Sequence, residues 1–394
     1  MDPIGSAYNR KACQELNFPA EVYLVDSTIR SLQSGVSGST HSLEDLTAVG
    51  LAVDSLGVRE QIINVSWRDG LEVIANLRAA GVKSRLVATF RARNERAAEW
   101  TQAAAEAGAD EVSFESARDP QHLGELADLA ATHCVDFSHG FAEEYTTDEV
   151  VAIIRAGIEF GCRSQSFHDS FFHLAIGPEA IRAFIGEVRQ AVPDHPPLYV
   201  HLSNFFGHAT MTAIAALSAG ATAADVCLNG TGHHCGHTAL GEVALGLRGL
   251  YGVDCGIKTE RLAAAARAVE QCTSVPRRLD GPVIGEFAFM GDGAYWAAEA
   301  HLPFEDRMHA TFPVAPEVVG AEEKVVWSDR TATVEAVRVR MSQAGYLDAS
   351  DEQCAQLVHR IRVAIEDRGG YPGWLEDAEV GRFIDELIGS DRVG

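Results

Sequence analysis

The chain has 394 residues, of which 46% are hydrophobic and 22% charged, as is ordinary for a soluble globular enzyme. Its formal net charge of −24 argues against nucleic acid and anionic membrane as partners, because both require a basic surface. The N-terminal residues do not resemble a signal peptide, and no apolar stretch approaches the length of a membrane span. Eight cysteines without a C-x-x-C pair are expected to be reduced, which predicts a cytoplasmic protein.

Short apolar runs rich in β-branched residues alternate with Ala- and Glu-rich helical segments up to about residue 280. This alternation is typical of repeated strand–helix units. Eight such units predict an α/β fold of the (β/α)₈ TIM-barrel type, for which about 250 residues suffice. We expect its strands near residues 22–26, 61–65, 85–90, 111–114, 134–138, 163–167, 198–201 and 225–228.

The chain beyond the predicted barrel has a different pattern. Residues 285–293 look like a loop, whereas 350–367 and 375–388 have the apolar spacing of amphipathic helices. We therefore predict a catalytic barrel domain over residues 1–280. A small, mainly helical C-terminal subdomain is expected over residues 281–394.

Polar residues follow most of the predicted strands, and TIM barrels carry their chemistry at these carboxyl ends. Histidine is frequent there: His201 is followed by His233, His234 and His237. An unperturbed imidazole pKa of about 6.5 suits both proton transfer and metal binding, so these histidines indicate an active site. Adjacent residues point in different directions, and at most one of His233 and His234 is expected to face the site. The polar positions at these strand ends are 26–33, Asn64, Arg91, Glu115, Ser138, His139, 168–170, 201–204 and 229–237.

The segment from residue 201 to 242 resembles the isopropylmalate and homocitrate synthases of the DRE-TIM metallolyase superfamily. In that family, a His-x-His-Asn-Asp run ends one barrel strand and Asn-Gly-x-Gly-Glu-Arg-x-Gly-Asn-Thr follows the next. Ser203 replaces the second metal-binding histidine of the family, and His237 replaces an asparagine beside the metal. His233 and His234 stand where the family has Glu-Arg. The matching residues are His201, Asn204, Asn229, Gly230, Gly232, Gly236, Thr238, Leu240 and Glu242.

Residues 25–34 resemble the family's Asp-Thr-Thr-Leu-Arg-Asp-Gly-Glu-Gln signature. Arg30 matches the arginine that polarises the oxo-acid carbonyl, but Ser31 stands where a metal-binding aspartate is expected. Asn64 occupies a place where the family usually carries glutamate. The resemblance covers nearly the whole chain and implies a homodimer.

The resemblance also implies roles for individual residues. Arg30, His201 and His237 are the predicted catalytic residues, and His201 and His237 are the expected ligands if a divalent metal is bound. A third ligand is left open among His233, His234, Asp169 and Cys235. The family's next histidines are missing after the barrel, where His301 or His309 could approach from elsewhere in the loop. The residues expected to bind substrate are Asn64, His139, His168, Asp169, Ser170, Ser203, Asn204, Gly230, Thr231 and Gly232.

Some of these positions also have purely structural interpretations. Asp169 is equally suited to cap the helix beginning near Gly177 or to pair with Arg163, and Asn64 to satisfy a backbone group. The residues expected only to pack are Trp67, Trp100 and Trp327.

Three functions remain open at this point. The leading hypothesis is an acyl-CoA-dependent, Claisen-type enzyme that forms a carbon–carbon bond with a 2-oxo acid, with altered substrates in a specialised pathway. The second is a lyase that runs a retro-aldol or retro-Claisen reaction, like hydroxymethylglutaryl-CoA lyase. The third is a non-catalytic relative that binds an oxo acid or a synthase partner. Release of thiol from thioesters distinguishes the three.

Overall fold

The computed structural model describes residues 7–34, 41–293, 299, 302 and 312–389. The chain divides into two compact units, Met1–Arg278 and Leu279–Gly394. No helix in the described ranges combines the length and the apolar character needed to cross a membrane. All eight cysteines are free.

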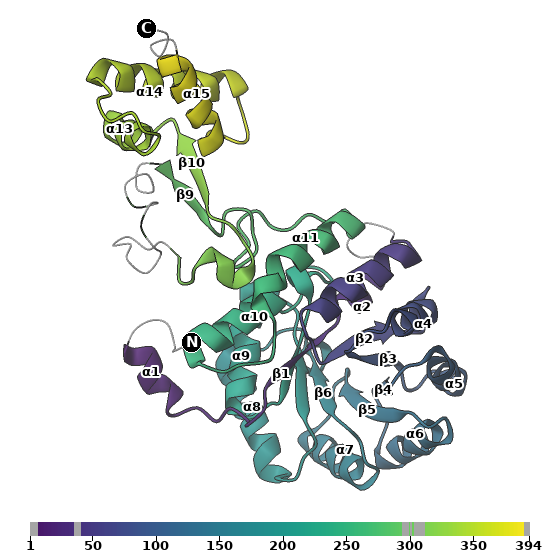
Figure 1. Cartoon of the computed structure of the whole chain (residues 1–394). Helices are drawn as coiled ribbons and strands as arrows, with labels where there is room; N and C mark the ends of the chain where they lie inside the picture. The colour runs from purple at the N-terminus through teal and green to yellow at the C-terminus, as the bar shows by residue number, and fades with distance from the viewer. Residues whose placement is uncertain (1–6, 35–40, 294–298, 300–301, 303–311, 390–394) are drawn as a thin grey trace. The chain divides into compact units, whose positions relative to one another are not determined.

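The first unit is a closed barrel of eight parallel strands, in which β1 pairs with both β2 and β8 (Figure 1). This confirms the predicted (β/α)₈ architecture. The strands are β1 (Tyr23–Asp26), β2 (Glu60–Asn64), β3 (Arg85–Arg91), β4 (Glu111–Glu115), β5 (Asp136–Phe141), β6 (Gln165–His168), β7 (Leu198–His201) and β8 (Ala223–Val226).

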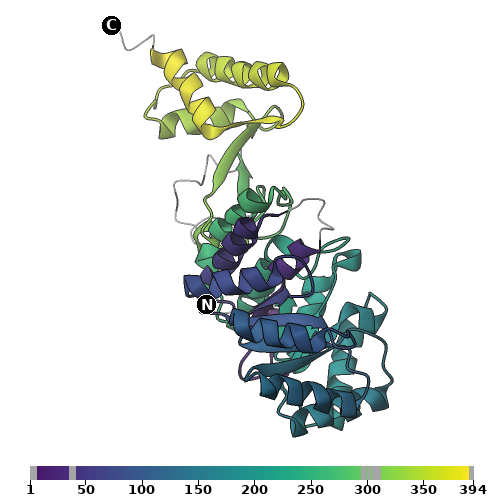
Figure 2. The ribbon, with the colours of Figure 1, turned by 90° about the vertical axis from the view of Figure 1, so that its right-hand side faces the viewer.

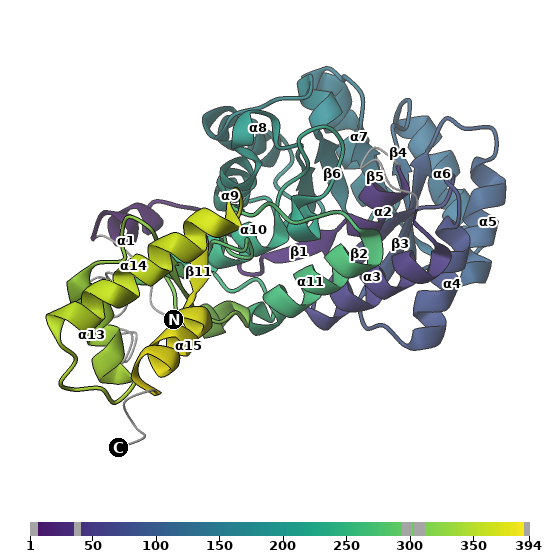
Figure 3. The ribbon, with the colours of Figure 1, turned by 90° about the horizontal axis from the view of Figure 1, so that it is seen from above.

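Helices surround the barrel, as the view from above shows (Figure 3). Each buries one apolar face; α4, for example, buries Val73, Ile74 and Leu77, which recur at helical spacing. Glycines in the left-handed conformation, such as Gly81 and Gly108, end helices. The helices of this unit are α1 (Ala7–Cys13), α2 (Thr28–Gln33), α3 (Leu43–Ser55), α4 (Gly70–Ala80), α5 (Ala97–Ala107), α6 (Pro120–Thr132), α7 (Thr147–Glu159), α8 (Pro178–Ala191), α9 (Ala209–Ala219), α10 (Leu240–Gly246) and α11 (Leu262–Thr273).

Two strands differ most from their predicted limits. The strand expected at residues 134–138 begins at Asp136 and continues to Phe141, because Cys134 adopts a left-handed turn with φ of 56°. The strand expected at 225–228 runs from Ala223 to Val226. A tight turn at Leu228–Gly230, with φ of 62° at Asn229, ends it early.

The second unit contains a three-stranded sheet as well as helices (Figure 2). The segment predicted as a loop at 285–293 includes a strand, and the helix expected from 375 begins at Asp377, after a strand. These strands supplement the mainly helical prediction, and Trp327 of the central strand is fully buried in the core of the unit. The elements are β9 (Met290–Asp292), β10 (Lys324–Ser328), β11 (Trp374–Glu376), α13 (Val334–Gln343), α14 (Asp351–Arg368) and α15 (Asp377–Gly389).

Candidate active site

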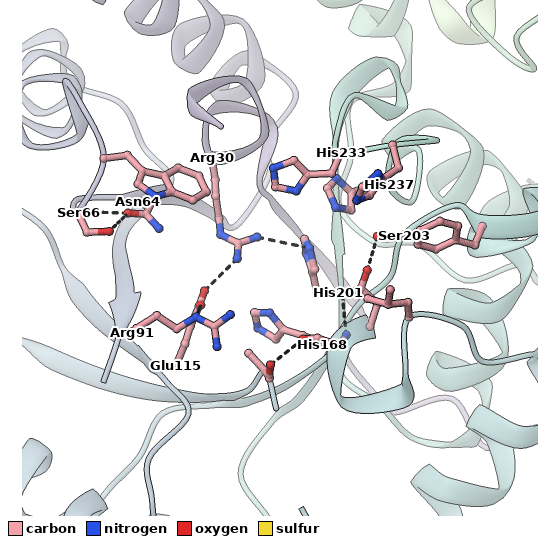
Figure 4. Close-up of a pocket in the computed structure, with 17 residues that line it drawn as sticks. Arg30, Asn64, Ser66, Arg91, Glu115, His168, His201, Ser203, His233 and His237 are labelled. Carbon is pink, nitrogen blue, oxygen red and sulfur yellow. Dashed lines mark hydrogen bonds and ion pairs between the residues drawn. The ribbon is translucent and has the colours of Figure 1, made fainter. Parts of the chain in front are cut away.

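A cavity of about 320 Å³ opens at the carboxyl ends of the barrel strands (Figure 4). This is the end at which TIM-barrel enzymes carry their catalytic residues, and the volume lies within the range of small-molecule sites. The histidine-rich loop after β8 forms one wall. Arg30 extends from α2 between this wall and the ends of β3 and β4.

Arg30 is held from two sides. The turn that precedes it is fixed by Asp26, whose carboxyl oxygens accept hydrogen bonds of 2.8 Å from the backbone N–H and the hydroxyl of Thr28. Its Nη2 donates to Oε1 of Glu115 at 3.0 Å, and its Nη1 lies 3.4 Å from Nε2 of His201. Nε of Arg30 is buried and has no hydrogen-bond partner among the described residues. The guanidinium is therefore oriented but retains donor capacity for a ligand.

Glu115 is the carboxylate behind this arginine. The parallel register of β3 and β4 places it beside Arg91, whose Nε lies 3.6 Å from Oε2. Burial would raise the pKa of Glu115, but the positive charge of Arg30, followed by other nearby positive groups, lowers it to about 2. Glu115 is therefore ionised at neutral pH and anchors both arginines.

His201 has its own carboxylate partner. The register of β7 and β8 pairs His201 with Asp225, and its Nδ1 lies 2.7 Å from Oδ2 of that residue. Ser27 donates a further hydrogen bond of 2.8 Å to the same oxygen. Burial opposes ionisation of Asp225, but the neighbouring His201 outweighs it and lowers its pKa. An ionised Asp225 accepts a hydrogen bond from Nδ1–H, so Nε2 is the ring nitrogen of His201 that faces Arg30.

His237 lies against His201, with 4.7 Å between the ring centroids. Its Nδ1 is 3.3 Å from both the Ser31 hydroxyl and the Thr231 carbonyl oxygen. Gly232 makes room for the ring, because a Cβ at this position would lie 1.8 Å from Nδ1. Burial, with the charges of His201 and Arg30, lowers the pKa of His237 to about 3, so the imidazole is neutral at physiological pH.

A divalent ion does not fit the described donors. Within residues 7–34, 41–293 and 312–389, no group of three or more His, Cys, Asp or Glu side chains is arranged to hold a metal. Nε2 of His201 faces the positive Arg30, and Nδ1 is committed to Asp225. The expected pair of ligands, His201 and His237, therefore lacks the third protein ligand that a catalytic ion normally has. His301 lies outside the described residues, as does His309.

The structure brings many of the predicted site residues together. Both adjacent histidines, His233 and His234, line the cavity, so the expectation that at most one faces it is wrong. The predicted residues along the wall are Arg30, Asn64, His168, Asp169, Ser170, His201, Ser203, His233, His234 and His237.

Other residues expected to bind substrate do not line the cavity. His139 is fully buried within β5, where its Nε2 accepts a hydrogen bond of 3.1 Å from the N–H of Ala117. Asn204 accepts one of 3.1 Å from the N–H of Ala209 at the start of α9. The residues that pack beneath or beside His237 are Gly230, Thr231 and Gly232.

The structural alternatives for Asp169 and Asn64 are also resolved. Asp169 accepts a hydrogen bond from the Ser203 hydroxyl and does not cap the helix after Gly177. Arg163 pairs instead with carboxylates at the opposite end of the barrel. The Asn64 side chain accepts hydrogen bonds of 2.9 and 2.7 Å from the N–H and hydroxyl of Ser66.

Several lining residues were not assigned to the site from sequence. Glu115 and Arg91 lie at the carboxyl ends of strands, and this position was the one feature of the sequence that indicated a role in the site. Trp67 lies on the wall of the cavity and is 36% exposed, so its assignment to packing is wrong. No motif in the sequence indicated that Asp225 supports the site. The additional lining residues are Ser66, Trp67, Arg91, Glu115, Ala142, Leu174 and Phe205.

Comparisons with known proteins agree with this architecture. Residues 82–269 match the HMGL-like family. The 2-isopropylmalate synthase of Methanocaldococcus jannaschii is 26% identical over 98% of this chain and 76% of its own. Homocitrate synthase AksA of Methanopyrus kandleri is 28% identical over 92% of each chain.

Solved structures show the same fold at lower identity. The HMG-CoA lyase of Bacillus subtilis has a TM-score of 0.54 and 18% identity over 65% of this chain and 95% of its own. Residues 82–269 thus match an HMGL-like domain, and the chain that contains them folds as a TIM barrel. Over nearly its whole length, the chain is similar to isopropylmalate and homocitrate synthases.

Proposed function

We propose that this protein is an acyl-CoA-dependent acyltransferase that joins the acyl group to a 2-oxo acid through a new carbon–carbon bond. The observation that carries this proposal is the contact between Arg30 and His201, each supported by its own buried carboxylate. The synthase relatives agree with it. Arg30 provides positive charge for an oxo acid, and His201 provides a base beside it.

Arg30 binds and activates the acceptor. Its fixed guanidinium offers N–H donors to the carboxylate and to the keto oxygen of a 2-oxo acid. Negative charge develops on that oxygen as the new bond forms, and a preorganised cation stabilises it there. Glu115 holds the guanidinium in place from behind, at 3.0 Å.

His201 carries the proton. Its Nε2 removes a proton from the carbon next to the thioester carbonyl, and the resulting enolate attacks the keto carbon. The Asp225 carboxylate stabilises the imidazolium formed in this step. The same proton then passes from Nε2 to the alkoxide of the product, so His201 returns to its initial state. Water cleaves the thioester and releases coenzyme A.

The charges of the cavity favour an acceptor with one carboxylate. Arg30 and Arg91 contribute two positive charges to the wall, and Glu115 and Asp169 contribute two negative charges. His237 is neutral there. Arg91 is already shared between Glu115 and Glu143, so a second substrate carboxylate would compete with them for a partner, which is costly in a partly buried site. The cavity also has apolar surface for a substrate side chain from Trp67, Leu174 and Phe205.

A thiol-release assay tests the function directly. Acetyl-CoA, malonyl-CoA and other thioesters are incubated with 2-oxo acids that have apolar or acidic side chains, and condensation products are identified by mass spectrometry. We expect turnover with a monocarboxylic acceptor. Cleavage of an added hydroxyacyl thioester without condensation would instead indicate a lyase, and oxo-acid binding without turnover a binding relative.

Arg30→Ala provides the specific test of the site. We expect it to abolish oxo-acid binding in calorimetry while the protein remains folded. Arg68→Ala is the matched control, because the side chain of Arg68 is 93% exposed. Unchanged binding in Arg30→Ala would refute the assigned role. The homodimer implied by the family resemblance stays a prediction, which sedimentation analysis checks.

A further inference from the structure

The interior of the barrel contains a polar cavity below the active site. TIM barrels fill their interior mainly with bulky branched side chains, whereas Ser113, Ser138 and Ser166 line this part of the interior. They leave a space of about 20 Å³, whose lining is polar or charged except for Ile62 and Val87. One water molecule needs about 10–15 Å³ and several polar partners, and this cavity provides both.

At the end nearest the carboxyl ends of the strands, this interior cavity adjoins the active site. His168 lines both cavities, and its Nε2 lies 3.0 Å from the Ser166 hydroxyl. Asp225 also lines the interior cavity, and its buried Oδ1 has no hydrogen-bond partner among the described residues. Since buried carboxylate oxygens are normally hydrogen-bonded, this oxygen is a second indication of an internal water site.

At the end nearest the amino ends of the strands, the interior cavity is lined by two buried carboxyl groups, Glu60 and Glu111, which are 4% and 1% exposed. The Tyr199 hydroxyl donates to Oε1 of Glu60 at 3.1 Å and lies 2.7 Å from the hydroxyl of Tyr23. Ser138 lines the same cavity as Glu111 and opposes the rise that burial causes in the pKa of Glu111. Polar groups on one interior cavity therefore extend from the buried carboxyl groups to His168.

The charges around the carboxyl pair favour one retained proton. Arg85 and Arg163 both contact Glu111 at 3.3 Å and also pair with Asp136. Both guanidinium groups are thus shared between Glu111 and Asp136, and Glu60 adds a third carboxyl group at the same cavity. Burial, followed by the charge of Glu111, raises the pKa of Glu60 to about 7, and burial also raises the pKa of Glu111. The titratable and charged groups surrounding the pair are Tyr23, Arg59, Arg85, Asp136, Arg163 and Tyr199.

We propose that Glu60 and Glu111 hold one proton between them and exchange it with the active site across the interior cavity. The path runs from Glu111 through the Ser138 hydroxyl to a water molecule in the cavity. It continues through the Ser166 hydroxyl to His168. Each hydroxyl accepts one proton as it releases another, so the members of the path are unchanged after a transfer.

This inference rests on the proposed function for its source of protons. Hydrolysis of the thioester product forms a carboxylic acid, which ionises at neutral pH and releases one proton in each turnover. The carboxyl pair accepts that proton through the path when it is ionised and later returns it to solvent. Glu60 and Glu111 are positioning residues in this scheme, because neither contacts the substrate.

The first experiment does not require turnover. Infrared spectra recorded across neutral pH should show a protonated carboxyl band in the wild type that titrates there. Glu60→Gln should remove the Glu60 component of this titration and leave that of Asp26, because burial also raises the pKa of Asp26 to about 7. Ser138→Ala should shift the band because Glu111 loses a polar neighbour in the cavity. Spectra unchanged by both variants would overturn the proposal. Thermal unfolding shows that each variant is folded.

The second experiment uses the thiol-release assay with the active wild type. Ser138→Ala should lower kcat about tenfold, the effect of a hydrogen bond lost in a rate-limiting proton transfer, with little change in KM. Its solvent deuterium isotope effect should rise. Ser218→Ala is the control, because this buried hydroxyl lies on α9, outside the barrel interior. Equal kcat and isotope effects in both variants would refute the path. A wild type without turnover would refute the proposed function alone, since the infrared test remains.

Discussion

Asp225→Asn tests the proposed base most directly. The change preserves the size of the side chain but replaces the charged oxygen that accepts the hydrogen bond from His201 at 2.7 Å. An amide can donate to Nδ1, and this would place the imidazole proton on Nε2, where the base needs a lone pair. The hydroxyl of Ser27, 2.8 Å from the same carboxylate oxygen, also loses its charged acceptor.

The expected magnitude follows from these contacts. A hydrogen bond to a charged group contributes about 1.5–3 kcal/mol, which corresponds to roughly 10- to 150-fold in rate if it is lost only in the transition state. Fixing the wrong tautomer extends the loss toward about 10⁴-fold. We therefore expect kcat to fall by about 10² to 10⁴, with the KM for the oxo acid little changed because Arg30 is intact.

Stability gives an independent measure of the same contact. Folding lowers the pKa of Asp225, so its ionisation stabilises the wild type above the unfolded pKa of about 4, and this contribution is lost as the pH falls through the lower folded pKa. Asp225→Asn should thus lower Tm at neutral pH more than in acid. Asp128→Asn, on the exposed face of α6, is the control. A kcat within twofold of the wild type in folded Asp225→Asn would refute the role of this dyad.

Three further predictions concern the wall around the base. Gly232→Ala should displace the His237 ring, since the new Cβ would lie 1.8 Å from Nδ1, and should therefore lower the rate of thiol release. Gly186→Ala is the control, because a Cβ at Gly186 would meet no atom within 4 Å, and its rate of thiol release should be unchanged. His237 is neutral when folded, with a pKa of about 3 against about 6.5 when unfolded, so it stabilises the fold above pH 6.5 and loses this effect as the pH falls toward 3. His237→Asn should flatten the decline of Tm in this range. Because Arg30 faces His201, a chelator should leave both Tm and thiol release unchanged.

Each of these expectations has a result that contradicts it. Equal thiol release by the two glycine variants would show that the ring position at His237 is unimportant. An unaltered acid dependence of Tm in His237→Asn would mean that this residue is not neutral in the folded protein. Stoichiometric metal in elemental analysis, together with activity lost in chelator and restored by the ion, would contradict the inference that the donors around His201 do not fit a divalent ion.

The roles of Arg30 and His201 illustrate how far the sequence extends toward a site. Both follow predicted strands, and all strands of a parallel barrel end at the same face, so their proximity was predictable without coordinates. Their supporting carboxylates were not. Glu115 is 85 positions from Arg30, and Asp225 is matched to His201 only by the register of β7 and β8. No local pattern specifies such a pairing.

The sequence by itself determined the barrel, because strand and helix periodicities are local properties that each segment carries. It also determined that arginine and histidine meet at one rim, since strand direction is common to all eight units. Only the tertiary structure decided which carboxylate supports each of them and that Trp67 lines the cavity. The same holds for the space between Ser138 and Ser166. These contacts depend on the register and closure of the barrel, which join side chains that are distant along the chain.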